Sequence, residues 1–279
     1  MISKAFIQEW KPQAPWRGDH QIEQDLILSR CVVEIYKCES VKDSIAFRGG
    51  TALQKLFVKT PFRYSEDIDL VQIKKEPIGK VLDEIREKLD PIFPKKPQVN
   101  RKEGRVTIIY RFESSDVPAI PLKLKIEINI AEHFNVYPLS KLPFEVSSKW
   151  FSGKAECLTY NLNELMGTKI RALYQRKKGR DLFDLYWISK NRKDFVPMEA
   201  IKAFEKYIEH EGNKISRAEF EQNLAAKKAS STFGLDVAQL LQKHEQEAFD
   251  IAEAFRVVET EIAPLLKGEP WAGDKKSKK

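Results

Sequence analysis

Cysteine is scarce in this sequence, and its spacing excludes two kinds of site. There are three cysteines, Cys31, Cys38 and Cys157, with no CxxC spacing and no cluster with histidine. An odd number of widely separated cysteines argues against a disulfide framework and against a zinc site. We therefore expect buried, reduced thiols in a cytoplasmic protein.

Long apolar runs are also missing. The first residues soon include Glu9, Trp10 and Lys11, so no apolar signal segment is expected there. No run approaches the roughly 20 apolar residues that a membrane-spanning helix needs. The sequence predicts a soluble, intracellular protein with no membrane partner.

The composition indicates a folded, basic protein. The chain has 279 residues, of which 42% are hydrophobic, and a formal net charge of +7. This length suits one large domain or two ordinary ones with a packed core. The positive charge favours a polyanionic partner such as RNA, although a basic surface does not by itself require one.

Hydrophobic periodicity divides the chain into a mixed part and a helical part. After an irregular arm over 1–18, it predicts helices over 19–38, 51–58 and 78–89, and strands over 45–47, 67–72, 106–112 and 122–130. Beyond Tyr160 it predicts helices over 161–176, 181–190, 197–211, 216–228, 234–243 and 245–266, then a disordered tail. The expected fold class is α+β, with a mixed-sheet core over 1–155 and a helical domain over 156–279.

A glycine turn joins the first predicted strand to a helix. Gly49 and Gly50 precede Thr51, which could cap that helix and also offer its hydroxyl to a phosphate. The free backbone N–H groups at the positive end of a helix suit phosphate binding. The lysine pattern of a P-loop is absent, and a Gly-Gly pair before a helix is often only a turn.

Two aspartates on the next strand form a second candidate site. Asp67 and Asp69 lie two residues apart, so their side chains point to the same face of the strand. Carboxylates in this arrangement bind Mg²⁺, which is commonly shared with substrate phosphates, and two such ions can clamp a displacement at phosphorus. The alternative is a solvated strand end that carries paired acids.

Glu127 is a candidate third carboxylate. It shares the polar face of the 122–130 strand with Lys125 and Asn129, opposite an alternating apolar face. If that strand lies beside the Asp67 strand, Glu127 reaches the same ions. An ordinary exposed face of an amphipathic strand explains the spacing equally well.

A basic stretch opens the helical part. Residues 169–180 hold six lysines and arginines, and Asp181 and Asp184 follow. Lys169, Arg176 and Arg180 would fall near one stripe if the helix continued, which suits phosphate neutralisation or an RNA backbone. The alternative is a pair of charged helices joined by ion pairs such as Arg180–Asp184.

These motifs together resemble a known family. The segments that carry the resemblance are Phe47–Leu56 (FRGGTALQKL), Arg63–Leu70 (RYSEDIDL), Leu124–Asn129 (LKIEIN) and Thr168–Leu185 (TKIRALYQRKKGRDLFDL). They are similar to the AbiEii/AbiGii toxin family of nucleotidyltransferases, over roughly residues 1–190. The resemblance implies a DNA-polymerase-β-like core joined to a helical domain. It also implies Mg²⁺-dependent (or Mn²⁺-dependent) transfer from an NTP to RNA, with tRNA 3′ ends as a target class. The implied partner is an AbiEi-type antitoxin, often in phage defence.

The resemblance also implies roles for individual residues. Those expected to hold the triphosphate are Gly49, Gly50 and Thr51, with Arg63 and Ser65 from the second motif. Those expected to bind metal are Asp67, Asp69 and Glu127. Lys169 and Asp184 are expected near the nucleotide as catalytic residues. The turn here is Gly-Gly-Thr where many polymerase-β-like enzymes have Gly-Ser, and the third acid is glutamate, one methylene longer than aspartate.

Two other functions fit the same sequence. One is an enzyme with the same core that modifies a protein hydroxyl, by AMP transfer or autophosphorylation. The other is a non-catalytic module that grips RNA or an antitoxin with the basic helices. Paired metal ligands and Lys169 argue against the second, because a pure binding module does not need them.

Overall fold

The computed structural model describes residues 2–242, 246 and 248–273. It divides into two compact units, Met1–Asn161 with Leu241–Lys243, and Leu162–Leu240 with His244–Lys279. The tail that the sequence predicts to be disordered lies, from residue 274, outside the described residues. Where the chain is described, no helix is long and apolar enough to cross a membrane.

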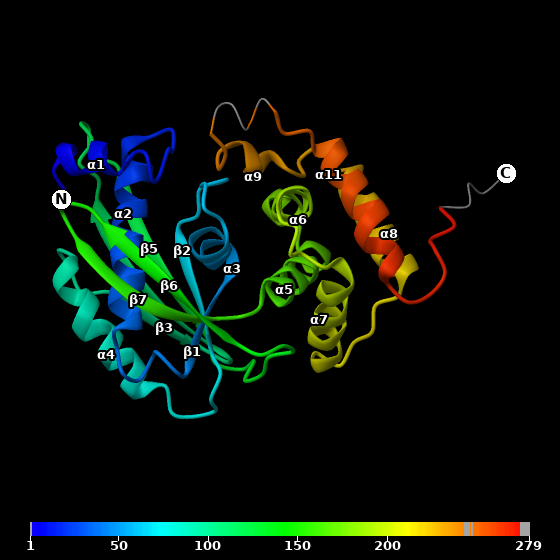
Figure 1. The fold of residues 1–279 in the computed structure, drawn as a ribbon, viewed down its shortest axis with the longest axis horizontal. Coiled ribbons are helices and arrows are strands. Elements are labelled where there is room, and N and C mark those ends of the chain that lie inside the picture. Colours follow the sequence, from blue (N-terminus) through cyan, green and yellow to red (C-terminus); the bar gives the residue numbers. More distant parts are fainter. Residues whose placement is uncertain (1, 243–245, 247, 274–279) are drawn as a thin grey trace. The chain divides into compact units, whose positions relative to one another are not determined.

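The first unit is built on a mixed seven-stranded sheet (Figure 1). Its strands are β1 (Ile45–Arg48), β2 (Asp67–Gln72), β3 (Gln98–Lys102), β4 (Arg105–Glu113), β5 (Pro121–Asn129), β6 (Ser140–Ser147) and β7 (Ser152–Thr159). The strand order is β3-β4-β5-β2-β1-β7-β6. Strand β2 runs antiparallel to β1 and parallel to β5. The four predicted strands are confirmed.

Three strands, β3, β6 and β7, were not predicted. Strands β3 and β6 form the two edges of the sheet, and both are largely exposed. Strand β3 shows no apolar alternation, whereas β6 alternates Leu142, Phe144 and Val146 with other residues, a pattern that the prediction missed. Strand β6 also contains Pro143, a residue that sheets tolerate at an edge. The first half of β7 is small and polar.

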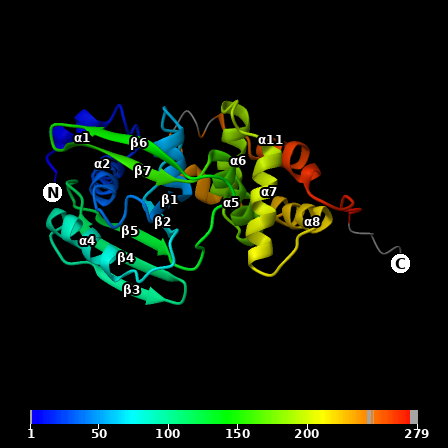
Figure 2. The same ribbon diagram turned by 60° about the horizontal axis from the view of Figure 1, so that its bottom comes forward.

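One long helix fills the concave side of this sheet. The helical segments of the first unit are α1 (Lys4–Trp10), α2 (Asp19–Tyr36), α3 (Gly49–Ala52), π-helical η1 (Leu53–Phe57), α4 (Gly79–Leu89) and 3-10 helix η2 (Asp90–Ile92). Helix α2 contacts β2, β5, β6 and β7, and the sheet curves around it (Figure 2). Leu124, Ile126 and Ile128 of β5 are buried, which confirms the predicted alternation. The polar face of β5 therefore points away from the core.

Asp25 of α2 anchors the N-terminal arm and the helix after the glycine turn. Its buried carboxylate accepts hydrogen bonds from Trp10 Nε1 at 2.9 Å and Trp16 Nε1 at 3.2 Å. Lys55 Nζ, in η1, lies 2.8 Å from both carboxylate oxygens. The prediction of an irregular arm was wrong, because residues 4–10 form α1 and Trp10 packs into the core.

The second unit is helical, as predicted. Its helices are α5 (Leu162–Gln175), α6 (Gly179–Asn191), α7 (Pro197–His210), α8 (Arg217–Lys228), α9 (Leu235–Ala238) and α11 (Ile251–Val257). Helix α11 continues as π-helical η3 (Val258–Ile262) and 3-10 helix η4 (Ala263–Leu265). The predicted helix over 234–243 was too long, because α9 is a single turn; residue 243 lies outside the described residues. Of the predicted helix over 245–266, residues 245 and 247 lie outside the described residues, and residues 249 and 250 are not helical. Helix α11 begins after this break, at Ile251, where the Asp250 side chain caps it by accepting from Ala252 N.

A buried lysine joins two helices of the second unit. Lys227 of α8 is 3% exposed and donates from Nζ to the carbonyl oxygen of Tyr174, near the end of α5, at 3.0 Å. Burial, with a smaller contribution from Lys177, lowers the pKa of its ammonium from 10.5 to about 8. Near neutral pH this unit therefore carries a charge that its surroundings disfavour.

We expect Asp25→Ala to destabilise the first unit strongly. Removing one partner of a buried ion pair leaves the other charge uncompensated, at a cost of about 3–5 kcal/mol. Here Lys55 would stay buried, and two tryptophans would lose their acceptor. Urea denaturation followed by circular dichroism measures the loss. Lys80→Ala, which removes an exposed partner of Glu84, is the control. A loss for Asp25→Ala no larger than that of the control would contradict the account.

We expect the stability of the wild-type protein to rise with pH relative to Lys227→Met. Unfolded Lys227 keeps its proton up to about pH 10.5, whereas the folded form releases it from about pH 8. The unfolded state binds more protons in that window, so the free energy of unfolding increases with pH. The wild-type minus variant difference in the free energy of unfolding should grow by about 3 kcal/mol across this window, at about 1.4 kcal/mol per pKa unit. A pH-independent difference would show that Lys227 does not titrate there.

Candidate functional site

Strand register brings the predicted carboxylates together beside the glycine turn. Arg48, the last residue of β1, pairs with Asp69 of β2, so Gly49 follows directly beside that aspartate. On the other side of β2, Asp69 pairs with Glu127 and Asp67 pairs with Lys125 of β5. The sequence placed Glu127 near the aspartates only if its strand lies beside the Asp67 strand, and the pairing of β2 with β5 meets that condition.

The two glycines are required by close approach. Gly49 has φ +81°, and a Cβ at this position would lie 2.2 Å from Asp69 Oδ2. A Cβ at Gly50 would lie 2.2 Å from Nη2 of the buried Arg63. Only glycine readily adopts the positive φ of Gly49, and only a residue without a Cβ leaves room for the Asp69 and Arg63 side chains at these two positions. The turn therefore lies directly against one predicted metal ligand and one predicted phosphate-binding cation.

Thr51 and Ser65 connect the helical segment after the turn to β2. Thr51 is buried, its Oγ1 lies 2.7 Å from Ser65 Oγ, and its hydroxyl donates to the carbonyl oxygen of Asp67. The prediction that Thr51 caps the helix was wrong. The chain becomes helical immediately after β1, so Arg48 is the N-cap and Thr51 is the third helical residue. The threonine fixes where β2, and hence Asp67, begins.

Cations on β4 and β5 balance the carboxylates. Lys125 Nζ lies 3.0 Å from Asp67 Oδ2 and 3.6 Å from Glu127 Oε2. Arg105 Nη1 lies 3.2 Å from Glu127 Oε1. These side chains are partly exposed, so the pairs are reached by solvent. The sequence placed Lys125 on this face but did not identify it as a counterion.

The carboxylate cluster disfavours negative charge. Burial raises the pKa of the Asp69 carboxyl, and the charges of Asp67 and Glu127 raise it further. Burial alone would lower the pKa of Lys125, but its attraction to Asp67 and Glu127 outweighs this effect and raises it. Like-charged carboxylates held together with a cation between them are a setting in which more positive charge is favourable.

The donor set fits a hard divalent cation. Asp67 and Asp69 share one face of β2, and carboxylate oxygens are the ligands that Mg²⁺ prefers. Within the described part of the chain, no group of three or more His, Cys, Asp or Glu side chains is gathered as a metal site. In this structure, Lys125 supplies the positive charge beside Asp67 and Glu127.

Sequence reasoning missed an ion pair at the end of β1. Arg48 Nη1 contacts Glu132 Oε2, and both side chains are mostly buried. Asn129 Oδ1 accepts from the backbone N–H groups of Ala131 and Glu132 at 2.9 Å each, which shapes the turn after β5. The position of Arg48, directly before the two glycines, was the one sequence signal that could have identified it as part of the site. Nothing in the sequence pointed to Glu132.

In the second unit, the structure brings Lys169 and Asp184 together. Lys169 Nζ lies 2.8 Å from Asp184 Oδ2 and 3.4 Å from Asp181 Oδ1. Arg176 donates to both oxygens of Asp181, at 2.7 and 2.9 Å. Lys169 and both aspartates are buried. Helix α5 ends at Gln175, so the stripe that required a continuous helix is not formed.

We expect Gly49→Ala to disturb the site, whereas Gly79→Ala should not. An alanine at Gly49 would force an unfavourable φ, which costs roughly 1–2 kcal/mol, and would push Asp69 away. A Cβ on Gly79 would meet nothing within 4 Å. Thermal unfolding and a crystal structure of each variant test this. An unchanged Asp69 position in Gly49→Ala would contradict the close approach.

Comparison with known proteins places this arrangement in a family. The family model for the nucleotidyl transferase AbiEii toxin of type IV toxin–antitoxin systems matches residues 33–257. No curated protein matches the chain. A similar solved structure is the nucleotidyltransferase toxin MenT4 from Mycobacterium tuberculosis, with a TM-score of 0.65 and 16% identity over 95% of this chain and 92% of that one. A protein from H. pylori described as a candidate nucleotidyltransferase gives 0.48 and 14%, over 90% and 100%.

The structural likeness to MenT4 concerns the fold, and it confirms the predicted α+β nucleotidyltransferase class. The family match covers most of the chain and contains all ten predicted site residues. The protein is therefore a nucleotidyl transferase that belongs to the AbiEii toxin family of type IV toxin–antitoxin systems.

Proposed function

We propose that this protein transfers a nucleotide from an NTP to the 3′ hydroxyl of an RNA, with tRNA 3′ ends as the target class. The observation that carries the proposal is the contact of the Gly49 turn with Asp69, next to Asp67 and Glu127. A phosphate-binding turn and a carboxylate cluster within one site are the two parts that chemistry on a triphosphate needs.

The glycine turn is the proposed triphosphate site. The backbone N–H groups of Gly49, Gly50 and Thr51 are first-turn amides of a helical segment, which attract phosphate oxygens. Arg63, packed against Gly50, supplies positive charge, and Ser65 positions the Thr51 hydroxyl. Because the turn has no side chains at its glycines, a phosphate can approach the backbone closely.

Asp67 and Asp69, with Glu127, are the proposed ligands of Mg²⁺ or Mn²⁺. When bound, the ion would neutralise phosphate charge and orient the α-phosphate. Lys125 holds the side chains of Asp67 and Glu127 in place through its ion pairs. The RNA hydroxyl releases its proton to solvent and its oxygen bonds to the α-phosphorus. The bond between the α-phosphorus and the oxygen that bridges to the β-phosphate breaks, and pyrophosphate leaves.

Lys169 and Asp184 of the second unit keep their predicted roles as part of this proposal. Within that unit, Asp184 and Asp181 fix the ammonium of Lys169 through ion pairs. The family description supports a partner, which we propose to be an AbiEi-type antitoxin acting in phage defence. The net charge of +7 supports RNA as the acceptor.

Incubation of the purified protein with each α-³²P-labelled NTP, Mg²⁺ and total RNA tests the proposal on a denaturing gel. Label in a tRNA-sized band is the expected result, and the labelled NTP identifies the base. Label on the protein would instead establish modification of a protein hydroxyl. Label on neither, with folded protein, would favour a non-catalytic binding module.

We expect Asp67→Asn and Asp69→Asn each to lower transfer by at least roughly a hundredfold, because each replaces a charged ligand of the proposed metal ion with a neutral amide, which binds the ion less well. Both substitutions preserve size, so melting temperatures should stay close to that of the wild-type protein. Asp83→Asn, on an exposed position of α4, is the control with the same chemical change. Wild-type rates in either site variant would contradict the assignment.

A further inference from the structure

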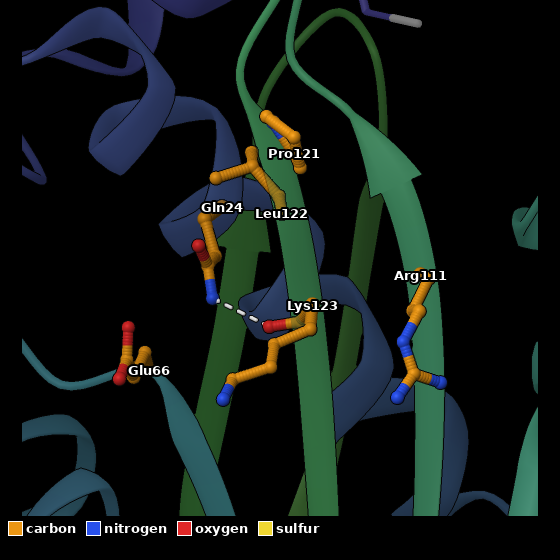
Figure 3. A pocket seen from close by; sticks show the side chains of 6 residues that line it. All are labelled: Gln24, Glu66, Arg111, Pro121, Leu122 and Lys123. Carbon is orange, nitrogen blue, oxygen red and sulfur yellow. Dashed lines mark hydrogen bonds between the residues drawn. The ribbon is translucent and has the colours of Figure 1, made fainter.

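A surface pocket opens beside the carboxylates, at the edge of β5. It has a volume of about 380 Å³ and is lined by Gln24, Glu66, Arg111, Pro121, Leu122 and Lys123 (Figure 3). Pockets that bind small organic groups have volumes of roughly 300–1,000 Å³. All its lining residues belong to the first unit, and neither the family motifs nor the proposed mechanism uses Arg111 or Lys123.

The pocket exists because β2 is shorter than β5. Strand β2 begins at Asp67, opposite Lys125, so residues 121–123 of β5 have no partner in β2. Gln24 Nε2 fills part of that gap by donating to the carbonyl oxygen of Lys123 at 2.9 Å. In Figure 3 the Lys123 side chain extends toward Glu66, while Arg111 lies on the neighbouring strand. The unpaired end of β5 thus has a hydrogen bond at the carbonyl oxygen of Lys123, while the side chains around it line an open pocket.

Arg111 and Lys123, which we term the β4–β5 basic pair, lie directly opposite each other in the sheet. Residues so paired share one face, and this face also carries Lys125 and Glu127. Arg111 donates to Gln98 Oε1 at 3.0 Å. Among the described residues, neither member of the pair has an ion-pair partner, in contrast to Lys125 and Arg105. Both are exposed, so their charge is available to an anion.

Basic residues along β5 lead from the pocket to the proposed reaction site. Lys123 and Lys125 are two residues apart, which is roughly 6.7 Å along a strand, and Lys125 already contacts Asp67. The basic pair therefore lies two residues along β5 from Lys125, on the side away from the proposed reaction site. Beyond the pair, Pro121 and Leu122 give the pocket an apolar wall. Glu66, which directly precedes Asp67, adds a carboxylate to the pocket on the side of the reaction site.

We propose that the single-stranded 3′ end of the acceptor RNA lies along this face, with a phosphate on Arg111 and Lys123 and an unstacked base in the pocket. This inference rests on the proposed function, because it specifies where that acceptor binds. A basic surface that follows the backbone and a site for a base are the features by which proteins hold single strands. Glu66 can accept from a base amino group or a 2′-hydroxyl, whereas it would repel a phosphate.

Fluorescence anisotropy with a short labelled single-stranded RNA, without NTP, tests the inference. Lys123→Glu and Arg111→Glu should each weaken binding several-fold. Lys154→Glu, an exposed lysine on β7 with the same change in charge, should have a much smaller effect. Lys123→Ala should reduce the slope of log K against log salt concentration by about 0.7, the value for one lost phosphate contact to a single strand.

Four results would overturn the inference. They are no binding of RNA by the wild-type protein, equal losses in Lys123→Glu and Lys154→Glu, an unchanged salt slope in Lys123→Ala, and equally tight binding of a blunt duplex that depends equally on Lys123.

Transfer kinetics separate this inference from the proposed function. If the basic pair holds the acceptor, Lys123→Glu raises the KM for RNA and leaves the KM for NTP unchanged. Wild-type protein that binds RNA through the pair but transfers no nucleotide would contradict the proposed function and leave only the RNA-binding role of this face standing. Transfer with an unaltered KM for RNA would contradict this inference alone.

Discussion

The position of β2 between β1 and β5 is the constraint on which the candidate site depends. Because β2 pairs with β1 on one side and β5 on the other, Asp69 has Arg48 and Glu127 as its neighbours. The glycine turn follows Arg48 without an intervening residue, so it must pass over Asp69. A slip of one residue would send the aspartates to the opposite face of the sheet. The buried Asp25–Lys55 pair and the Thr51 hydroxyl hold the helical segment after the turn against this strand arrangement.

The same face of the sheet gathers charge that the fold does not need for its own stability. The apolar residues of β5 pack against α2, while the opposite face holds three acids and the cations near them. Lys125 neutralises part of this charge. Burial, and then the charges of Asp67 and Glu127, raise the pKa of the Asp69 carboxyl. Carboxyl groups whose pKa is perturbed by burial and by neighbouring charges are typical of functional sites. The β4–β5 basic pair extends the same face outward, so one surface serves both proposed substrates.

Local sequence patterns predicted the elements whose two faces differ most. Strand β5 alternates strictly because one face is buried, and the spacing of Asp67 and Asp69 followed from the geometry of any strand. The pairing of β2 with β5 could only be stated as a condition, because it joins residues about 58 positions apart in the chain. Edge strands such as β3 carry no alternation to detect. The prolines and tryptophans within residues 1–18 favour an irregular arm, whereas the packing of α1 depends on the distant acceptor Asp25. The counterion role of Lys125 likewise depends on a neighbouring strand that local patterns do not specify.

A crystal structure with Mn²⁺ and a non-hydrolysable NTP analogue tests the central claim most directly. Anomalous scattering locates the metal independently of the protein's own density. The account predicts a manganese peak between Asp67 and Asp69, with the analogue's phosphates on the backbone N–H groups of residues 49–51. Metal or triphosphate bound away from the β1–β2 turn would contradict it.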